Sequence, residues 1–242
     1  MVDPVTVSVL MQESGVAFGT SGARGLVSAM NDRVCHGYVS GFLRHLVEQK
    51  LWASQGDVAL AGDLRPSTPR ILAACSLAIR DLGAKPMFCG FVPTPALAFF
   101  AMSKGIPAIM VTGSHIPDDR NGIKFYRPDG EVLKDDEPGI LRQPIAERDW
   151  DAAGYSRDLP PLPKPFDITG AYVARYIDFF GRDALNGSRI GVYQHSAVGR
   201  DLLVEVLAAL GADVVSLGRS ERFVPVDTEA VRPEDAALAR EW

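Results

Sequence analysis

The chain has 242 residues, of which 47% are hydrophobic and 23% are charged, and its formal net charge at pH 7 is −5. These values are typical of a globular protein, and they exclude collagen, a disordered tail and a disulfide scaffold. The acidic balance, with lysine and arginine scattered along the chain, excludes an electrostatic footprint for nucleic acid. Because single domains mostly hold about 100–150 residues, we expect two domains.

The cysteines and the apolar runs favour a cytoplasmic location. Cys35, Cys75 and Cys89 form no C-x-x-C pair, as expected in a reducing compartment. The amino terminus lacks a basic region before its apolar residues, so we expect no secretory signal. No uncharged apolar run approaches the ~20 residues that span a bilayer. We therefore expect a cytoplasmic protein with no membrane partner.

From residue 31 onward, apolar residues alternate between helical and strand periods. The pattern predicts, in chain order, a helix at 36–52, a strand at 57–62, a helix at 68–82, a strand at 85–89, a helix at 94–103 and a strand at 107–112. This βαβαβ order predicts a mostly parallel sheet with helices on its faces. A P-D-G turn between two β-rich runs predicts a hairpin over residues 122–133.

Composition shifts at residues 151–168, where four prolines stand between residues 160 and 165 and predict an extended linker. Beyond it the pattern predicts a helix at 169–180, a strand at 189–194, a helix at 199–210, a strand at 212–217 and a helix that opens at Pro233. We therefore expect an α/β domain over residues 1–150 and a second, incomplete α/β domain over residues 169–242.

The densest polar segment is residues 111–126, VTGSHIPDDRNGIKFY, at the carboxyl end of a predicted parallel strand. Ligands bind at that edge of open α/β sheets, which makes Ser114 the candidate nucleophile. A Ser-His-Asp hydrolase is disfavoured, because Ser114 lacks the G-x-S-x-G turn and the adjacent His115 would project away from it. The remaining histidines carry no motif, and we interpret them as surface or satisfied side chains: His36, His45 and His195.

A second segment, AFGTSGARG at residues 17–25, combines three glycines with two hydroxyl residues and Arg24. We expect a flexible loop whose backbone N–H groups face an anion while the guanidinium supplies positive charge. Two further segments, GDLRPST at residues 62–68 and GFVPTP at residues 90–95, are typical of βα turns. On the predicted strand order, all four segments lie at one edge of the sheet.

Together these loops resemble those of the α-D-phosphohexomutases, the family of phosphomannomutases and phosphoglucomutases. FGTSGARG at residues 18–25 resembles the family's amino-terminal FGT-x-G-x-RG loop. TGSHIPDDRNGIK at residues 112–124 resembles its phosphoserine loop, T-[AG]-S-H-N-P-x-x-x-N-G-x-K. GFVPTP and residues 189–215 continue the resemblance in order. It implies an amino-terminal fragment with the family's first α/β domain and part of its second.

Carried over residue by residue, the resemblance implies that Ser114 bears the transferable phosphoryl group. His115, Lys124 and Arg24 would serve proton transfer or charge stabilisation, because positioned cations stabilise the charge of a phosphoryl group in transfer. The resemblance also implies substrate or phosphate contacts for five further residues: Thr20, Ser21, Gly22, Arg65 and Asn121. The implied reaction moves phosphate between the 1- and 6-positions of a hexose phosphate through a bisphosphorylated sugar.

The chain departs from the family pattern in three places. Ile116 stands where the family has asparagine, and the loop after Gly62 is one residue shorter than G-x-D-x-R-x-S. The family holds magnesium with a D-G-D-x-D-R loop and the phosphoserine, because hard cations prefer oxygen ligands. No such triple occurs in this chain, so the one implied metal ligand is the phosphate on Ser114. We interpret three acidic clusters as solvated surface: residues 118–119, 135–137 and 149–151.

We therefore expect a magnesium-dependent isomerase of hexose phosphates that uses a hexose 1,6-bisphosphate as activator. The resemblance implies that this chain alone has little turnover, because carboxyl-terminal domains complete the family's site. The alternative is a non-catalytic fragment or phosphosugar-binding module, and a third hypothesis is a phosphomonoester hydrolase with a serine phosphoenzyme. The sequence does not distinguish mannose from glucose phosphate, since the sugar-recognition loop is not in it.

Overall fold

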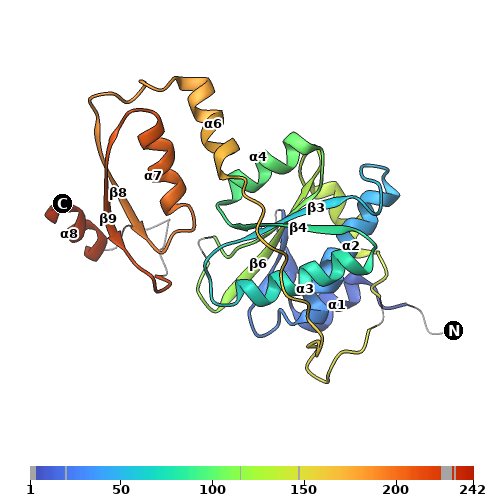
Figure 1. Ribbon diagram of the computed structural model, residues 1–242. Helices are drawn as coiled ribbons and strands as arrows, with labels where there is room; N and C mark the ends of the chain where they lie inside the picture. Colours follow the sequence, from blue (N-terminus) through green and yellow to red (C-terminus); the bar gives the residue numbers. More distant parts are fainter. Residues whose placement is uncertain (1–3, 20, 115, 147, 225–230, 232) are drawn as a thin grey trace.

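The computed structural model describes residues 4–242, apart from residues 20, 115, 147, 225–230 and 232 (Figure 1). Its first part holds a seven-stranded sheet of β1 (Ala17–Phe18), β2 (Gly22–Leu26), β3 (Asp57–Gly62), β4 (Lys85–Phe91), β5 (Ala108–Val111), β6 (Arg120–Arg127) and β7 (Gly130–Glu131). The helices of this part are α1 (Val7–Ser14), α2 (Asp32–Glu48), α3 (Thr68–Asp81), α4 (Thr94–Lys104) and α5 (Glu137–Leu141). Figure 1 shows helices on both sides of the sheet.

The sheet is mixed, and its parallel half follows from the βαβαβ order. Its strands lie in the order β1-β2-β6-β5-β3-β4, with β7 beside β6. As predicted, β3 is parallel to β4 and β5, whereas each further pairing toward β1 is antiparallel. The α/β fold with helices on both faces is therefore confirmed, and β6 and β7 form the hairpin that the P-D-G turn predicts.

The register of the strands brings the predicted polar segments to one edge. Gly62 at the end of β3 pairs with Val111 at the end of β5 and with Phe91 at the end of β4. On the other side of β5, Val111 pairs with Ile123, and Ile123 pairs with Ala23 of β2. The segments that follow β3, β4 and β5 therefore leave the sheet at the same edge, next to β2 and β6.

Helices cover the two faces of the sheet differently. α1, α2 and α3 pack on the face that buries Ala23, Ile123 and Phe125. α4 packs on the other face, over β3 and β5. Because successive strand residues point to opposite faces, Arg24 and Lys124 lie on this second face. There, β2 and β6 line an open pocket of about 490 Å³ instead of contacting a helix.

The glycine-rich segment that the sequence predicts as a flexible loop is an antiparallel hairpin. Ala17 of β1 pairs with Arg24 of β2, and β2 continues the sheet along β6. Gly22 permits this close approach, because a Cβ atom there would lie 2.0 Å from the Ile123 carbonyl oxygen. Three other elements are absent from the sequence prediction: α1, α5 and the 3₁₀ turn η1 (Lys134–Asp136).

Most helix and strand ends agree with the predicted ones to within two residues, and α2 is the exception. It begins four residues earlier than predicted because Asn31 caps it, accepting a hydrogen bond from the Val34 N–H at 3.0 Å. It ends at Glu48, so the last turn of the predicted helix is not helical. An apolar stripe thus locates a helix better than it locates the helix ends.

The second part of the chain contains α6 (Thr169–Phe180), β8 (Arg189–His195), α7 (Arg200–Ala209), β9 (Asp213–Arg219) and α8 (Pro233–Glu241). β8 and β9 form a parallel pair, with α7 as their crossover. Tyr172 of α6 and Val206 of α7 share one hydrophobic cluster with Leu97 of α4 and Met110 of β5. This shared cluster joins the second part to the sheet of the first.

The proline-rich segment, residues 151–168, crosses the surface of the first part as a strap (Figure 1). It has turns at residues 152–153 and 157–158 and is extended from residue 159 onward. The Ser156 N–H donates to Asp32 Oδ2 at 3.0 Å, and the Phe166 N–H donates to the Phe88 carbonyl at 2.7 Å. Leu162 is partly buried and packs against the hydrophobic core of the first part. The extended conformation is what the prolines predict, and a domain boundary at this segment stays a prediction.

No helix within the described residues is long and apolar enough to cross a membrane. The longest, α2, has 17 residues and includes Asp32, Arg33 and Arg44. The cysteines are free thiols inside the first part, and burial raises the pKa of Cys89 to about 11. These thiols therefore stay protonated near neutral pH.

Candidate active site

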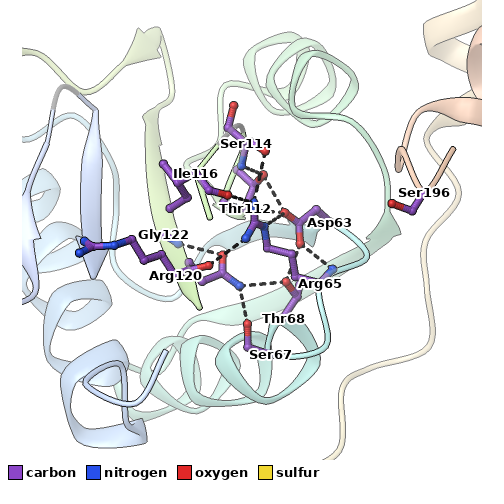
Figure 2. Close-up of polar contacts among 12 residues, drawn as sticks. Asp63, Arg65, Ser67, Thr68, Thr112, Ser114, Ile116, Arg120, Gly122 and Ser196 are labelled. Atoms are coloured by element: carbon purple, nitrogen blue, oxygen red, sulfur yellow. Dashed lines mark hydrogen bonds and ion pairs between the residues drawn. The ribbon is translucent and has the colours of Figure 1, made fainter. Parts of the chain in front are cut away.

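Ser114 lies in the loop that follows β5, at the edge where the loop after β3 also leaves the sheet (Figure 2). Its side chain is exposed, and its backbone N–H donates to Thr112 Oγ1 at 3.0 Å. Its φ of 51° is in the left-handed region that residues other than glycine rarely occupy. Such a backbone costs about 1–3 kcal/mol and persists only where neighbouring contacts hold it.

Asp63 holds the two loops together through both oxygens of its carboxylate, which is largely buried. Oδ1 accepts hydrogen bonds from Thr68 Oγ1 at 2.6 Å and from the Arg65 N–H at 3.0 Å. Oδ2 accepts from Thr112 Oγ1 and from the Gly113 N–H, each at 3.0 Å. One carboxylate thereby joins the end of β3, the start of α3 and the residues that precede Ser114.

Arg65 binds the backbone of the Ser114 loop through a side chain that is 2% exposed. Its two Nη atoms donate to four loop carbonyls, those of Ser114 at 3.4 Å, Ile116 at 2.5 Å, Pro117 at 2.7 Å and Arg120 at 3.0 Å. Its Nε lies 3.5 Å from Asp63 Oδ2. Burial lowers the pKa of Arg65, and the negative charge of Asp63 opposes that shift. Arg65 therefore sets the shape of the loop.

Two further residues, Asn121 and Gly113, pack the Ser114 loop against α3 and the turn that precedes it. Asn121 is fully buried, and its Nδ2 donates to Ser67 Oγ at 2.9 Å and to Thr68 Oγ1 at 3.1 Å. Gly113 packs directly on the guanidinium, because a Cβ atom there would lie 2.1 Å from Arg65 Nε. The loop that carries Ser114 is therefore held on several sides by side chains of α3 and the preceding turn.

The pocket between β2 and β6 carries the positive charge of the site. Arg24 is paired with Gly122 across the strands, and Lys124 is paired with Gly22, so both cations stand on the same face. The lining residues are Gly19, Ser21, Gly22, Ala23, Arg24, Thr112, Gly122, Ile123, Lys124 and Glu131. Thr112, two residues before Ser114, connects the pocket to the serine loop. Two cations beside that loop suit an anionic ligand.

The structure thus separates the predicted site residues into groups. Arg24, Lys124, Ser21 and Gly22 line the pocket, with Ser114 on the adjoining loop. Arg65 and Asn121, for which the resemblance implies phosphate contacts, stand behind that loop and bind its backbone and its support. The predictions for Thr20 and His115 fall on residues outside those that the structure describes.

Asp63, Thr68 and Thr112 are the members of this site that sequence reasoning misses. Asp63 and Thr68 lie in residues 62–68, which are predicted as a βα turn and compared with the family's G-x-D-x-R-x-S loop, and Thr112 begins the serine-loop motif without a role of its own. One signal was present, because a carboxylate that directly follows a buried strand lies at the ligand-binding edge of a parallel sheet. The partner of that carboxylate is almost fifty residues away, and nothing in the local pattern identifies it.

The acidic clusters are not uniformly solvated, contrary to the sequence interpretation. Asp136 is buried, and its carboxylate contacts Arg127 Nη1 at 3.1 Å and His45 Nε2 at 3.0 Å. It also accepts a hydrogen bond from the Leu133 N–H at 2.7 Å. Within the described residues, no three His, Cys, Asp or Glu side chains gather so that they could hold a metal ion.

The buried histidines have partners, as expected of satisfied side chains. His36 Nε2 lies 2.8 Å from Asp81 Oδ2, and His36 Nδ1 lies 3.3 Å from Ser40 Oγ. Burial lowers the pKa of His36, although the hydrogen bond to Asp81 opposes the shift. The Ser40 side chain is buried, so this serine–histidine–aspartate row cannot reach a substrate.

Comparison with known proteins agrees with this geometry. Residues 15–150 match the family model described as phosphoglucomutase/phosphomannomutase, alpha/beta/alpha domain I. The chain is 46% identical over 233 residues to a phosphomannomutase of Salmonella muenchen, with 96% of this chain and 47% of the relative covered. It is 41% identical over 231 residues to a phosphomannomutase of Sinorhizobium fredii, with 94% and 48% covered.

A solved structure of a phosphoglucomutase/phosphomannomutase family protein from Burkholderia thailandensis has the same fold. It superposes with a TM-score of 0.65 at 22% identity and covers 85% of this chain and 44% of that one. The chain thus spans about half the length of the curated relatives it matches. The family model covers more than half of the chain, and the chain therefore belongs to the phosphoglucomutase/phosphomannomutase family.

Proposed function

We propose that this chain carries the phosphoserine half of a phosphohexomutase site, with Ser114 as the phosphoryl donor. The observation that carries the proposal is the placement of Ser114. It has a left-handed backbone conformation on a loop to which buried Asp63 and Arg65 are hydrogen-bonded, beside a pocket with Arg24 and Lys124. Phosphoryl transfer requires mainly positioning and charge stabilisation, and both are present here.

The proposed reaction conserves its phosphoryl groups. The P–O bond to Ser114 Oγ breaks as a hydroxyl oxygen of a hexose monophosphate bonds to the phosphorus. That hydroxyl releases its proton to a base, and the departing Ser114 Oγ takes up a proton. The resulting hexose bisphosphate reverses its orientation in the site, and its other phosphoryl group is then transferred back to Ser114. Lys124 and Arg24 would stabilise charge on the transferred oxygens, and His115 is proposed as a proton carrier. Ser21, Gly22 and Thr20 would contact the sugar or its phosphate.

A magnesium ion would supply further charge stabilisation next to the phosphoserine. No three His, Cys, Asp or Glu side chains gather among the described residues, and the one ligand proposed from this chain is the phosphate on Ser114. Because the matched relatives are about twice as long, we propose that turnover and sugar choice require segments outside this chain. The substrate class is a hexose phosphate, with a hexose 1,6-bisphosphate as activator.

The test is phosphoryl transfer to the purified chain. Incubation with glucose 1,6-bisphosphate is expected to add one phosphoryl group, which intact-mass spectrometry detects and fragmentation assigns to Ser114. Ser114→Ala should abolish the gain, whereas Ser54→Ala, at an exposed serine outside the site, should leave it unchanged. An unmodified Ser114 would favour a phosphosugar-binding module, and steady release of inorganic phosphate would favour a phosphomonoester hydrolase.

A further inference from the structure

The second part of the chain contacts the residue that shapes the Ser114 loop. The ring of Phe223, four residues after β9, stands over the Arg65 guanidinium with 4.8 Å between Cζ and the ring centroid. Arg65 is the side chain that binds the carbonyls of Ser114 and its neighbours. A residue of the second part therefore lies one contact away from the phosphoserine loop.

Phe223 lies in residues 220–224, a segment held by hydrogen bonds within the second part. The Val224 N–H donates to Ser196 Oγ at 2.8 Å, and the Ser220 N–H donates to the His195 carbonyl at 2.8 Å. Arg200 is largely buried, and its Nη1 donates to the carbonyls of both Ser220 and His195. These contacts hold residues 220–224 against the end of β8, so the position of the Phe223 ring follows the fold of the second part.

The planar face of the Arg65 guanidinium is available to the Phe223 ring. Its N–H groups lie in the plane of the group, and both Nη atoms are used by loop carbonyls. The Gly113 backbone packs on the group so closely that no Cβ atom fits, and the Phe223 ring covers it as well. An aromatic face attracts a cation, and this attraction grows when water is excluded, as it is around Arg65.

We propose that Phe223 is a positioning residue for Ser114 and acts through Arg65. While residues 220–224 are docked on the first part, the Phe223 ring holds the Arg65 guanidinium against the four carbonyls. This keeps Ser114 in its left-handed backbone conformation. When that segment undocks, water competes with the loop carbonyls for the Arg65 guanidinium, and the Ser114 loop becomes less ordered. The coupling itself stands on these contacts, and only its consequence for phosphoryl transfer rests on the proposed function.

Hydrogen exchange of the full chain, measured by mass spectrometry on peptides covering residues 112–122, tests the coupling. The amides of Gly113, Ser114 and Ile116 are hydrogen-bonded and should be protected in the wild type. Phe223→Leu keeps an apolar side chain but removes the aromatic face, and we expect roughly three- to tenfold faster exchange there. Phe223→Tyr keeps the face and should restore wild-type protection.

The matched control is Phe179→Leu, at a phenylalanine of α6 that is 80% exposed, and its loop exchange should equal that of the wild type. Equal protection in the wild type and Phe223→Leu would overturn the proposal, and so would equal loss in the leucine and tyrosine variants. A second readout is the rate of Ser114 phosphorylation, which should fall in Phe223→Leu and recover in Phe223→Tyr. If the wild type takes up no phosphate, the proposed function fails while the exchange experiment still decides the coupling.

Discussion

At the scale of single residues, the Asp63 carboxylate links the loops that follow β3 and β5. Its two oxygens accept four hydrogen bonds, from Arg65, Thr68, Thr112 and Gly113. Asp63→Asn would replace one acceptor with an amide that faces existing donors. We expect the free energy of unfolding to fall by about 1–3 kcal/mol, measured by urea denaturation, together with slower phosphorylation of Ser114.

The control for that change is Asp57→Asn, at the exposed first residue of β3. It should alter the free energy of unfolding by no more than about 0.5 kcal/mol. Equal stability of Asp63→Asn and the wild type would contradict the assignment of Asp63 as the link between the loops.

Arg24 gives the opposite pattern, because its side chain is exposed in the pocket and makes no hydrogen bond to another of the described residues. Arg24→Ala should leave the free energy of unfolding nearly unchanged. The rate of phosphoryl transfer to Ser114 should fall by about a hundredfold, since one cation facing the transferred group is lost. Quenched-flow phosphorylation measures this rate, and Arg157→Ala, at an exposed arginine of the strap, serves as the charge-matched control. Equal rates in both variants would remove Arg24 from the site.

At the scale of elements, His36 lies between α2 and α3 and makes their packing sensitive to pH. Its side chain is buried against Asp81, and burial lowers its pKa below the unfolded value. The unfolded chain therefore binds a proton more readily, so this contribution is complete above the unfolded pKa and is lost as pH falls below it. We expect a smaller free energy of unfolding at about pH 5.5 than at about pH 7.5.

His36→Gln isolates this histidine from the carboxylates that titrate over the same range. Its stability at neutral pH should be lower than that of the wild type, because a buried hydrogen bond to Asp81 is replaced by a poorer one. Its loss of stability between the two pH values, measured by urea denaturation, should be smaller than that of the wild type. An identical loss in both proteins would assign the pH dependence to other groups.

The long elements of the fold could be predicted from the sequence, whereas the short strands β1 and β2 could not. The stripe of α2 and the buried run of β3 extend over enough residues to define their period. β1 has two residues and β2 consists largely of small residues, so the alternation that marks a strand is missing there. Glycine instead indicates a loop, although at Gly22 it serves the close approach of β2 to β6.

The candidate site divides in the same way. Ser114, Arg24 and Lys124 could be predicted because the motifs that contain them are contiguous. Asp63 and Arg65 bind the Ser114 loop through hydrogen bonds to residues about fifty positions away. Partners so distant in the sequence leave no local pattern. Arg65 appeared in a motif position, but only its burial and its carbonyl partners show that it binds the loop backbone.

At the scale of the whole molecule, a single hydrophobic cluster connects the two parts of the chain. Tyr172 of α6 is 8% exposed and packs edge-on against Phe99 of α4, while Val206 of α7 belongs to the same cluster as Met110 of β5. Because the parts share buried surface, we expect them to unfold in one cooperative transition. Tryptophan fluorescence and far-ultraviolet circular dichroism should then give coincident denaturation curves.

Tyr172→Ala tests whether this shared cluster also stabilises the docking of the second part. Removing a buried aromatic side chain should lower the free energy of unfolding by about 3 kcal/mol, whereas Phe179→Ala, at an exposed ring on the same helix, should cost far less. If docking keeps Phe223 on Arg65, Tyr172→Ala should also speed hydrogen exchange in residues 112–122, although Tyr172 is not among the residues that bind that loop. Normal exchange there, in a variant whose α6 and α7 peptides exchange faster, would show that the Ser114 loop keeps its order without the second part.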